Sequence, residues 1–310
     1  MSHSAPRLAQ LLSEHILLLD GAMGTELERR GVPAPPPLWS AAALDSHPDI
    51  VLAIHREYVR AGADILVANT FRTNLRTLRA ATLLQRAAEL NRCAVNLAWW
   101  APRLEETRLR EIGTASRAVF IAASVAPLED CYSPRLVPKE SVLLREHMQM
   151  LTWLKAAAPD LIWFETMNTV REARAAAESA AEIALPFVIS FLLRQDGHLL
   201  SGERLEEAAA AVEPFDPLAV GLNCIPPDGI TTHLPRLRQA TSRSLAAYAH
   251  INNPMPTPGW SFSQDATPDQ YARQVKRWLE LGVRIIGGCC GTTPAHIRAD
   301  RDVVNHVDNA

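Results

Sequence analysis

The chain repeats one pattern of apolar and polar positions along most of its length. A short, continuous apolar run ends in a polar or small residue, and a longer segment follows in which apolar residues recur at helical spacing. Apolar runs without alternation are typical of parallel strands that are buried on both faces. Eight such runs occur, at residues 16–20, 64–69, 118–124, 160–165, 186–191, 218–223, 244–250 and 283–288.

The segments between the runs favour helices, as in PDIVLAIHREYVRAGA (48–63) and TVREARAAAESAAEIAL (169–185). Eight strands that alternate with helices predict a (β/α)₈ TIM barrel, which we take as one domain over residues 1–310 with a core from about 15 to 300. A doubly wound open sheet is the alternative, although no G-x-G-x-x-G motif or P-loop follows any of the runs. The Pro-rich stretch VPAPPPLWS (32–40) is expected to be an ordered loop over the barrel mouth.

Composition and charge narrow the range of partners. With 48% apolar residues, 21% charged residues and a net charge of −3, the chain has the profile of a globular protein with small-molecule substrates and gives no sign of a nucleic-acid or membrane partner. No apolar run approaches the roughly 18 residues of a spanning helix. No secretory signal is visible, so we expect a cytoplasmic protein whose five cysteines do not form a disulfide framework. An oligomer is possible, but the sequence does not determine one.

Polar and thiol side chains gather where the predicted strands end. In a barrel of this class the chemistry lies at the carboxyl ends of the strands. Three of the five cysteines fall there, whereas Cys93 lies in a predicted helix and Cys131 in a predicted loop. The strand ends carry, in order, Asp20, Asn69, Ser124, Glu165, Asn223 with Cys224, His250, and Cys289 with Cys290.

Cys289 and Cys290 are adjacent in GGCCG, a spacing that does not suit an ordinary disulfide, because neighbouring Cα atoms are only about 3.8 Å apart. Together with Cys224 they offer three thiolates, which suits a zinc ion with one exchangeable position. The flanking glycines would permit the sharp turn that such a site needs. A redox-sensing thiol pair and inert buried thiols are the alternatives that the residues leave open.

Four stretches resemble the homocysteine S-methyltransferase family: LLLDGAMGTELERRG (17–31), ADILVANTFRTN (63–74), GLNC (221–224) and GGCCGTTPAHI (287–297). The resemblance extends over nearly the whole chain. It implies a barrel whose catalytic zinc is held by Cys224, Cys289 and Cys290, and an enzyme that methylates the thiol of L-homocysteine to give methionine. The substrate thiolate, ionised at the zinc, would be the nucleophile, with no further catalytic residue.

The same resemblance implies how the amino acid is bound. Asp20 and Glu165 would hold the amino group of homocysteine. The backbone amides of Gly21 and Ala22, and the region of Thr70, would meet its carboxylate. The structural alternatives are helix capping for Asp20 and Thr70, and a buried ion pair for Glu165.

Two stretches depart from the pattern of the family. SVAPLEDCYSP (124–134) replaces a glycine-rich stretch of many relatives, and the role of its Cys131 is open. YAHINNPMP (248–256) places His250 near a position where some relatives carry a zinc-binding asparagine. We therefore expect His250 or Asn252 to fill the fourth zinc position at rest, with a hydrogen-bonding role for His250 as the alternative.

The methyl donor is the least determined feature. The chain ends after the barrel, without the folate and cobalamin modules of methionine synthase, which favours S-methylmethionine or S-adenosylmethionine ahead of betaine. A corrinoid protein as donor, another thiol or selenol acceptor, and a non-catalytic zinc or redox sensor are the alternatives. Aromatic residues near strand ends are candidates to cradle a methyl-bearing cation, with packing favoured for the third: Trp39, Phe71, Trp163 and Trp260.

Overall fold

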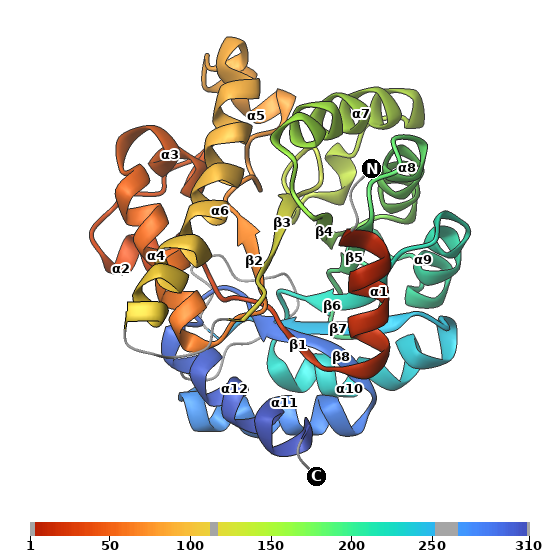
Figure 1. Cartoon of the computed structure of the whole chain (residues 1–310). Coiled ribbons are helices and arrows are strands. Elements are labelled where there is room, and N and C mark those ends of the chain that lie inside the picture. The colour runs from red at the N-terminus through yellow and green to blue at the C-terminus, as the bar shows by residue number, and fades with distance from the viewer. Residues whose placement is uncertain (1–3, 112–116, 252–265, 309–310) are drawn as a thin grey trace.

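Eight parallel strands form one sheet in the order β1-β8-β7-β6-β5-β4-β3-β2. The computed structural model describes residues 4–111, 117–251 and 266–308. A parallel bridge between Leu19 and Ile65 joins β1 to β2 and closes the barrel. Figure 1 shows the helices arranged around the strands. The predicted (β/α)₈ barrel is confirmed and the open sheet is wrong. The strands are β1 (Leu17–Leu18), β2 (Ile65–Ala68), β3 (Phe120–Val125), β4 (Leu161–Met167), β5 (Phe187–Phe191), β6 (Ala219–Asn223), β7 (Ser244–Ala249) and β8 (Val283–Gly288).

Helices surround the barrel, and local signals in the sequence fix their ends. Pro48 begins α4 and Gly62, at φ 109°, ends it, while Thr169 caps α8 by accepting from the Glu172 amide. The helices are α1 (Ser4–Glu14), α2 (Gly24–Arg29), α3 (Ala43–Ser46), α4 (Pro48–Ala61), α5 (Leu75–Ala80), α6 (Ala87–Glu111), α7 (Glu140–Ala157), α8 (Val170–Glu182), α9 (Leu205–Val212), α10 (Pro227–Ala240), α11 (Pro268–Glu280) and α12 (Pro294–Asp308). Short 3₁₀ helices cover Trp39–Ala42, Leu84–Arg86, Pro134–Leu136 and Glu213–Phe215.

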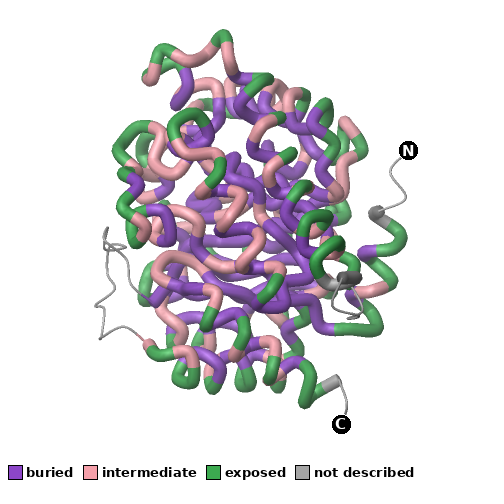
Figure 2. Tube along the Cα trace, turned by 60° about the vertical axis from the view of Figure 1, so that its left-hand side comes forward, coloured by how far each residue is buried: buried purple, intermediate pink, exposed green. Residues whose placement is uncertain are grey.

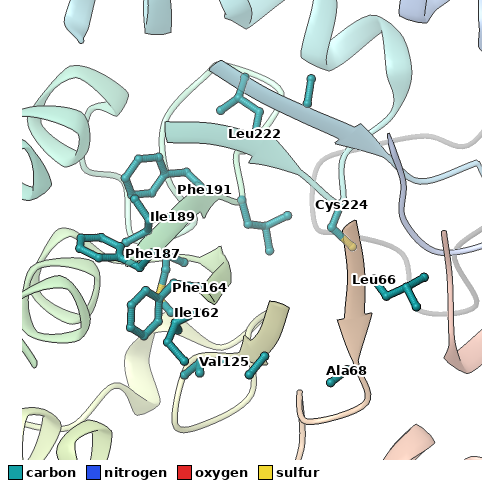
Figure 3. Close-up of a cluster of buried hydrophobic side chains, with 14 of the residues drawn as sticks. Leu66, Ala68, Val125, Ile162, Phe164, Phe187, Ile189, Phe191, Leu222 and Cys224 are labelled. Atoms are coloured by element: carbon teal, nitrogen blue, oxygen red, sulfur yellow. The ribbon is translucent and has the colours of Figure 1, made fainter. Parts of the chain in front are cut away.

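Nearly all strand residues are buried on both faces, because their side chains alternate between the barrel interior and the helices. The outward side chains form the larger core with the helices; Figure 3 shows Phe164, Phe187 and Phe191 in this layer, and Cys224 at the end of β6. In Figure 2 the buried positions accordingly concentrate in the strands, and the exposed ones lie on the outer helices.

The barrel interior changes from apolar to polar along the strands. Its apolar part is closed by α1, whose Leu8 and Leu12 pack on the first interior residues of the strands, such as Phe120 and Leu161. Trp163 faces the interior from β4, and Glu165 follows it two residues later on the same face, because every second side chain of a strand points the same way. A floor of apolar side chains therefore supports a polar layer at the carboxyl ends.

Candidate metal and substrate site

The structure brings the three predicted cysteines together at the carboxyl end of the barrel. The sulfur atoms of Cys224, Cys289 and Cys290 all lie within 4.8 Å of one another. Tetrahedral zinc with Zn–S bonds of about 2.3 Å needs sulfur atoms about 3.8 Å apart, so at most a small inward movement is required. Cys224 is buried and the other two are partly exposed. Three thiols in this arrangement fit a four-coordinate metal ion with one exchangeable position.

Strand pairing and one unusual backbone conformation fix the thiols. Cys224 adopts φ 54°, in the left-handed region, and its amide donates to the Tyr248 carbonyl at 3.2 Å. The Cys289 amide donates to the Ala249 carbonyl at 2.9 Å, and the Cys290 carbonyl accepts from the Ile251 amide at 3.0 Å. The end of β7 therefore holds both cysteine segments in place.

The glycines around the cysteine pair serve two different purposes. Gly291 has φ 84°, as expected for a turn. A Cβ on Gly287 would lie 2.6 Å from the Leu19 Cβ, and one on Gly288 would lie 2.2 Å from Thr292 Oγ1. The expectation that all three glycines permit the turn is therefore wrong for Gly287 and Gly288, which allow close packing against β1 and Thr292.

The three thiols differ in how readily each loses its proton. The pKa of Cys290 is held well below its usual range, because Cys224 and Cys289 donate hydrogen bonds to its sulfur. The pKa of Cys289 is raised by its hydrogen bonds to Cys224 and Cys290 and by burial. The cluster therefore carries one negative charge easily and resists further ionisation, which a bound cation would relieve.

Two carboxylates lie beside the thiols without a cationic partner. Burial raises the pKa of Asp20 well above its usual range, opposed by a hydrogen bond from the Val67 amide, and the charge of Glu165 raises it further. Burial also raises the pKa of Glu165, to about 7. Among the described residues no lysine or arginine pairs with either group. His55 Nδ1 lies 4.0 Å from Asp20 Oδ2, but burial lowers the pKa of His55 to about 4, so it is neutral.

The described residues show neither of the structural alternatives to substrate binding, which were a helix cap at Asp20 and a buried ion pair at Glu165. The N-cap of α2 is Met23, so Asp20 does not cap that helix. Glu165 accepts hydrogen bonds from Ser124 and from Tyr248, and no ion pair to it occurs within the described part of the chain. The arrangement suits an ammonium group that would pair with both carboxylates.

A hydrogen-bonded layer beneath Glu165 was missed at the sequence level. Tyr248 Oη donates to Glu165 Oε2 at 3.4 Å and accepts from Trp163 Nε1 at 2.7 Å. The Ser190 hydroxyl lies 2.5 Å from the same Tyr248 oxygen, to which it donates when Tyr248 donates to Glu165, and it also lies 3.0 Å from Asn223 Oδ1. All are interior positions by the two-residue repeat, which is the signal that would have identified them. Trp163 is a packing residue, but it packs edge-to-face on Tyr248 inside the barrel and not between the barrel and its helices, which was the expectation.

Two of the three residues expected to meet the substrate carboxylate, Ala22 and Thr70, already use polar groups, and the third, Gly21, is closely packed. The Ala22 amide donates to Thr292 Oγ1 at 3.3 Å, and Gly21 is enclosed so closely that a Cβ would lie 2.8 Å from Tyr58 Oη. Thr70 Oγ1 donates to the Ser124 carbonyl at 2.7 Å. Thr70 is not a helix cap, since Asn74 caps α5. These residues shape the wall of the site, and their role in binding stays a prediction.

The aromatic rings of Trp39 and Phe71 already contact a cation that belongs to the protein, the guanidinium of Arg72. The rings stack with centroids 6.1 Å apart, and the Arg72 guanidinium lies 4.1 Å from the Trp39 centroid and 5.3 Å from that of Phe71. Ser40 binds Asn69 at the end of β2, so the Pro-rich loop is ordered at the mouth as expected. Trp260 lies outside the described residues.

His250 is buried at the thiol cluster. Burial lowers its pKa to about 4, opposed by the charge of Cys290 and by a hydrogen bond to the Cys224 backbone. A neutral imidazole at this place suits either expected role, as a ligand or as a hydrogen-bonding group. Asn252, the other candidate for the fourth position, lies outside the described residues.

The stretch after β3, which departs from the pattern of the family, also reaches the thiol cluster. Tyr132 Oη lies 3.5 Å from Cys224 Sγ, a contact that sequence analysis did not anticipate. The neighbouring Cys131 is buried, and burial raises its pKa to about 12, so it is a poor nucleophile and a poor metal ligand.

Within the described residues, no helix is long and apolar enough to cross a membrane.

The chain matches the family model for homocysteine S-methyltransferases over residues 17–304. Homocysteine S-methyltransferase 1 from Arabidopsis thaliana is 30% identical over 303 residues, covering 91% of each chain. A selenocysteine methyltransferase from Astragalus bisulcatus is 28% identical over 322 residues, covering 95% of each. The crystal structure of the homocysteine methyltransferase MmuM from Escherichia coli, in its metallated form, matches with a TM-score of 0.81 at 30% identity, covering 94% of this chain and 97% of that one.

Proposed function

The chain belongs to the homocysteine S-methyltransferase family, and we propose that it methylates the thiol of L-homocysteine at a zinc ion bound by Cys224, Cys289 and Cys290. One observation carries the proposal: three thiols within 4.8 Å of one another lie beside two buried carboxylates that have no cationic partner among the described residues. The thiols suit the metal, and the carboxylates suit the amino group of an amino acid.

Zinc would supply the ionisation of the substrate thiol at neutral pH, since a coordinating thiol loses its proton. The protein's own residues supply position and charge. Three cysteinates give the site a net negative charge with Zn²⁺, which leaves a bound sulfur electron-rich and attracts a cationic methyl donor. S-methylmethionine and S-adenosylmethionine, both sulfonium ions, are the donors that we favour.

Asp20 and Glu165 would pair with the ammonium of homocysteine and so direct its side chain toward the thiol cluster. Both carboxylates are raised in pKa by burial, and a bound ammonium would offset that cost. Holding the nucleophile in one orientation is the main contribution that a methyl transfer needs from the protein. The similarity to a selenocysteine methyltransferase supports selenocysteine as a second acceptor, bound through the same ammonium contacts.

The test is methionine formation from homocysteine by zinc-loaded protein, with S-methylmethionine, S-adenosylmethionine, betaine and methylcobalamin supplied separately. A Cys290→Ala variant runs beside it, and selenocysteine replaces homocysteine in a second series. Turnover with one donor by the wild-type protein, and none by the variant, would support the proposal and identify the donor. Bound zinc at one ion per chain without turnover of any pair would count against catalysis with free donors and favour a protein-bound donor or a sensor.

A further inference from the structure

We propose that Tyr132 is a positioning residue of the metal centre, whose phenol donates a hydrogen bond to the Cys224 thiolate and moderates how strongly that sulfur donates to the metal. The inference rests on the proposed zinc site. Tyr132 Oη and Cys224 Sγ lie 3.5 Å apart, within hydrogen-bonding range for sulfur. A metal-bound cysteinate has no proton, so the phenol is the donor in that state.

The contact joins strands on different sides of the mouth. Tyr132 follows β3, whereas Cys224 follows β6. Residues 126–134 cross between them, and the Tyr132 amide is fixed by a bond of 3.2 Å to Asp130 Oδ1. Asp130 Oδ2 accepts from Ser133 Oγ at 2.7 Å, which completes a tight turn around Tyr132.

Side chains from outside the segment hold its middle part, at residues 128–131. The Leu128 amide donates to Glu172 Oε1 at 2.7 Å, and the Cys131 carbonyl accepts from Asn168 Nδ2 at 2.7 Å. Arg72 donates to the Glu129 carbonyl at 3.1 Å. Two stretches thus hold the segment, one after β4 with Asn168 and Glu172 and one after β2 with Arg72, so the phenol extends to the sulfur from a fixed loop.

The chemistry of the site gives such a bond a purpose. Three cysteinates and a substrate thiolate concentrate negative charge on one metal ion, and a hydrogen bond from a neutral donor disperses part of it. The bond also reduces electron donation by Cys224, so the metal withdraws more from the substrate sulfur and stabilises its thiolate. Tyr132 would therefore act on the reaction through Cys224.

Cobalt(II) in place of zinc gives the test, because thiolate-to-cobalt charge-transfer bands report the electron density on sulfur. Tyr132→Phe removes the hydroxyl and keeps the ring. We expect its bands to shift to longer wavelength, and its zinc affinity, measured by chelator competition, to fall by about tenfold. Ser133→Ala is the matched control, since it loosens the same turn and keeps the phenol; its bands should not move. Replacing Tyr132 with 3-fluorotyrosine, a stronger donor, should shift the bands the opposite way.

The outcomes separate this inference from the proposed function. Wild-type protein that binds cobalt without thiolate charge-transfer bands would overturn the metal centre and the role of Tyr132 together. Thiolate bands in the wild type that stay in place in both Tyr132 variants would overturn the role of Tyr132 alone. The role would be overturned even if affinity fell, because a loosened loop weakens binding without changing the electron density on sulfur.

Discussion

Tyr248 Oη donates a hydrogen bond of 3.4 Å to Glu165 Oε2, and this joins the carboxylate at the mouth to the polar layer inside the barrel. The same tyrosine oxygen accepts from Trp163 Nε1 at 2.7 Å, so its orientation is set from below. A carboxylate that binds a substrate ammonium needs this support, because burial alone disfavours its charge.

Tyr248→Phe should weaken homocysteine binding with little effect on the transfer step. The lost bond is long, so we expect about 1 kcal/mol, or roughly a fivefold rise in KM for homocysteine. Without the bond the pKa of Glu165 should rise further, since that bond lowers it. Steady-state kinetics at neutral and alkaline pH check this: the KM effect should shrink at high pH. A loss confined to kcat would contradict the assignment.

Homocysteine affinity should depend on the ionisation of Glu165. With a pKa of about 7 in the free protein, Glu165 is protonated below that pH and cannot pair with ammonium. The contribution of Glu165 to affinity should therefore rise as pH increases through about 7 and then level off. Binding below pH 7 should release a proton from Glu165 in addition to the one that the substrate thiol loses at the metal. Calorimetry in two buffers of different ionisation enthalpy measures both effects. Glu165→Gln should bind about tenfold more weakly and lose the part of the proton release that appears only below about pH 7, while the proton of the substrate thiol is still released at the metal; a variant that keeps the pH-dependent part would place the titration elsewhere.

Gly288→Ala should disrupt the metal centre through packing alone. The added Cβ would lie 2.2 Å from Thr292 Oγ1 and 2.6 Å from the Thr292 Cβ. Overpacking of this kind costs about 1–3 kcal/mol and displaces the adjacent Cys289. We expect a lower melting temperature and less bound zinc per chain. Gly24→Ala is the control, because its nearest neighbour would be 3.9 Å away, and it should leave both quantities nearly unchanged.

Asp300→Asn should stabilise the protein at high pH. Asp300 is buried, and neither of its carboxylate oxygens has a hydrogen-bond partner among the residues that the structure describes. Burial raises its pKa well above the usual 3.8, so the folded protein keeps a proton that the unfolded chain releases. Stability therefore falls as pH rises from the usual value through the folded-state pKa. Urea unfolding at pH 5 and pH 8 should show a gain for the variant of about 1–3 kcal/mol that is larger at pH 8.

Removal of the metal should expose the thiol cluster to oxidation. Cys224, Cys289 and Cys290 lie within 4.8 Å of one another, so a modest movement would bring two sulfurs to bonding distance. Mild peroxide should remove a pair of titratable thiols from metal-free protein and few from zinc-loaded protein. Reductant followed by zinc should restore activity. Equal thiol loss in both samples would argue that the metal does not occupy this cluster.

The barrel and the convergence of the three cysteines could be predicted from the sequence alone. Eight apolar runs fix the strands, and all parallel strands of a closed barrel end at one rim, so Cys224 after β6 and Cys289 after β8 must meet there. Asp20 and Glu165 reach the same rim for the same reason. This follows from topology and needs no knowledge of how the loops fold.

The contacts that run between loops and across the interior emerge only from the folded chain. Tyr132 reaches Cys224 because a turn after β3 is held by side chains from other elements. Arg72 occupies the aromatic faces of Trp39 and Phe71, which the sequence suggested for a methyl-bearing cation. Strand positions follow from the local periodicity of hydrophobic residues. Loop contacts depend instead on long-range hydrogen bonds and close packing, which no local pattern encodes.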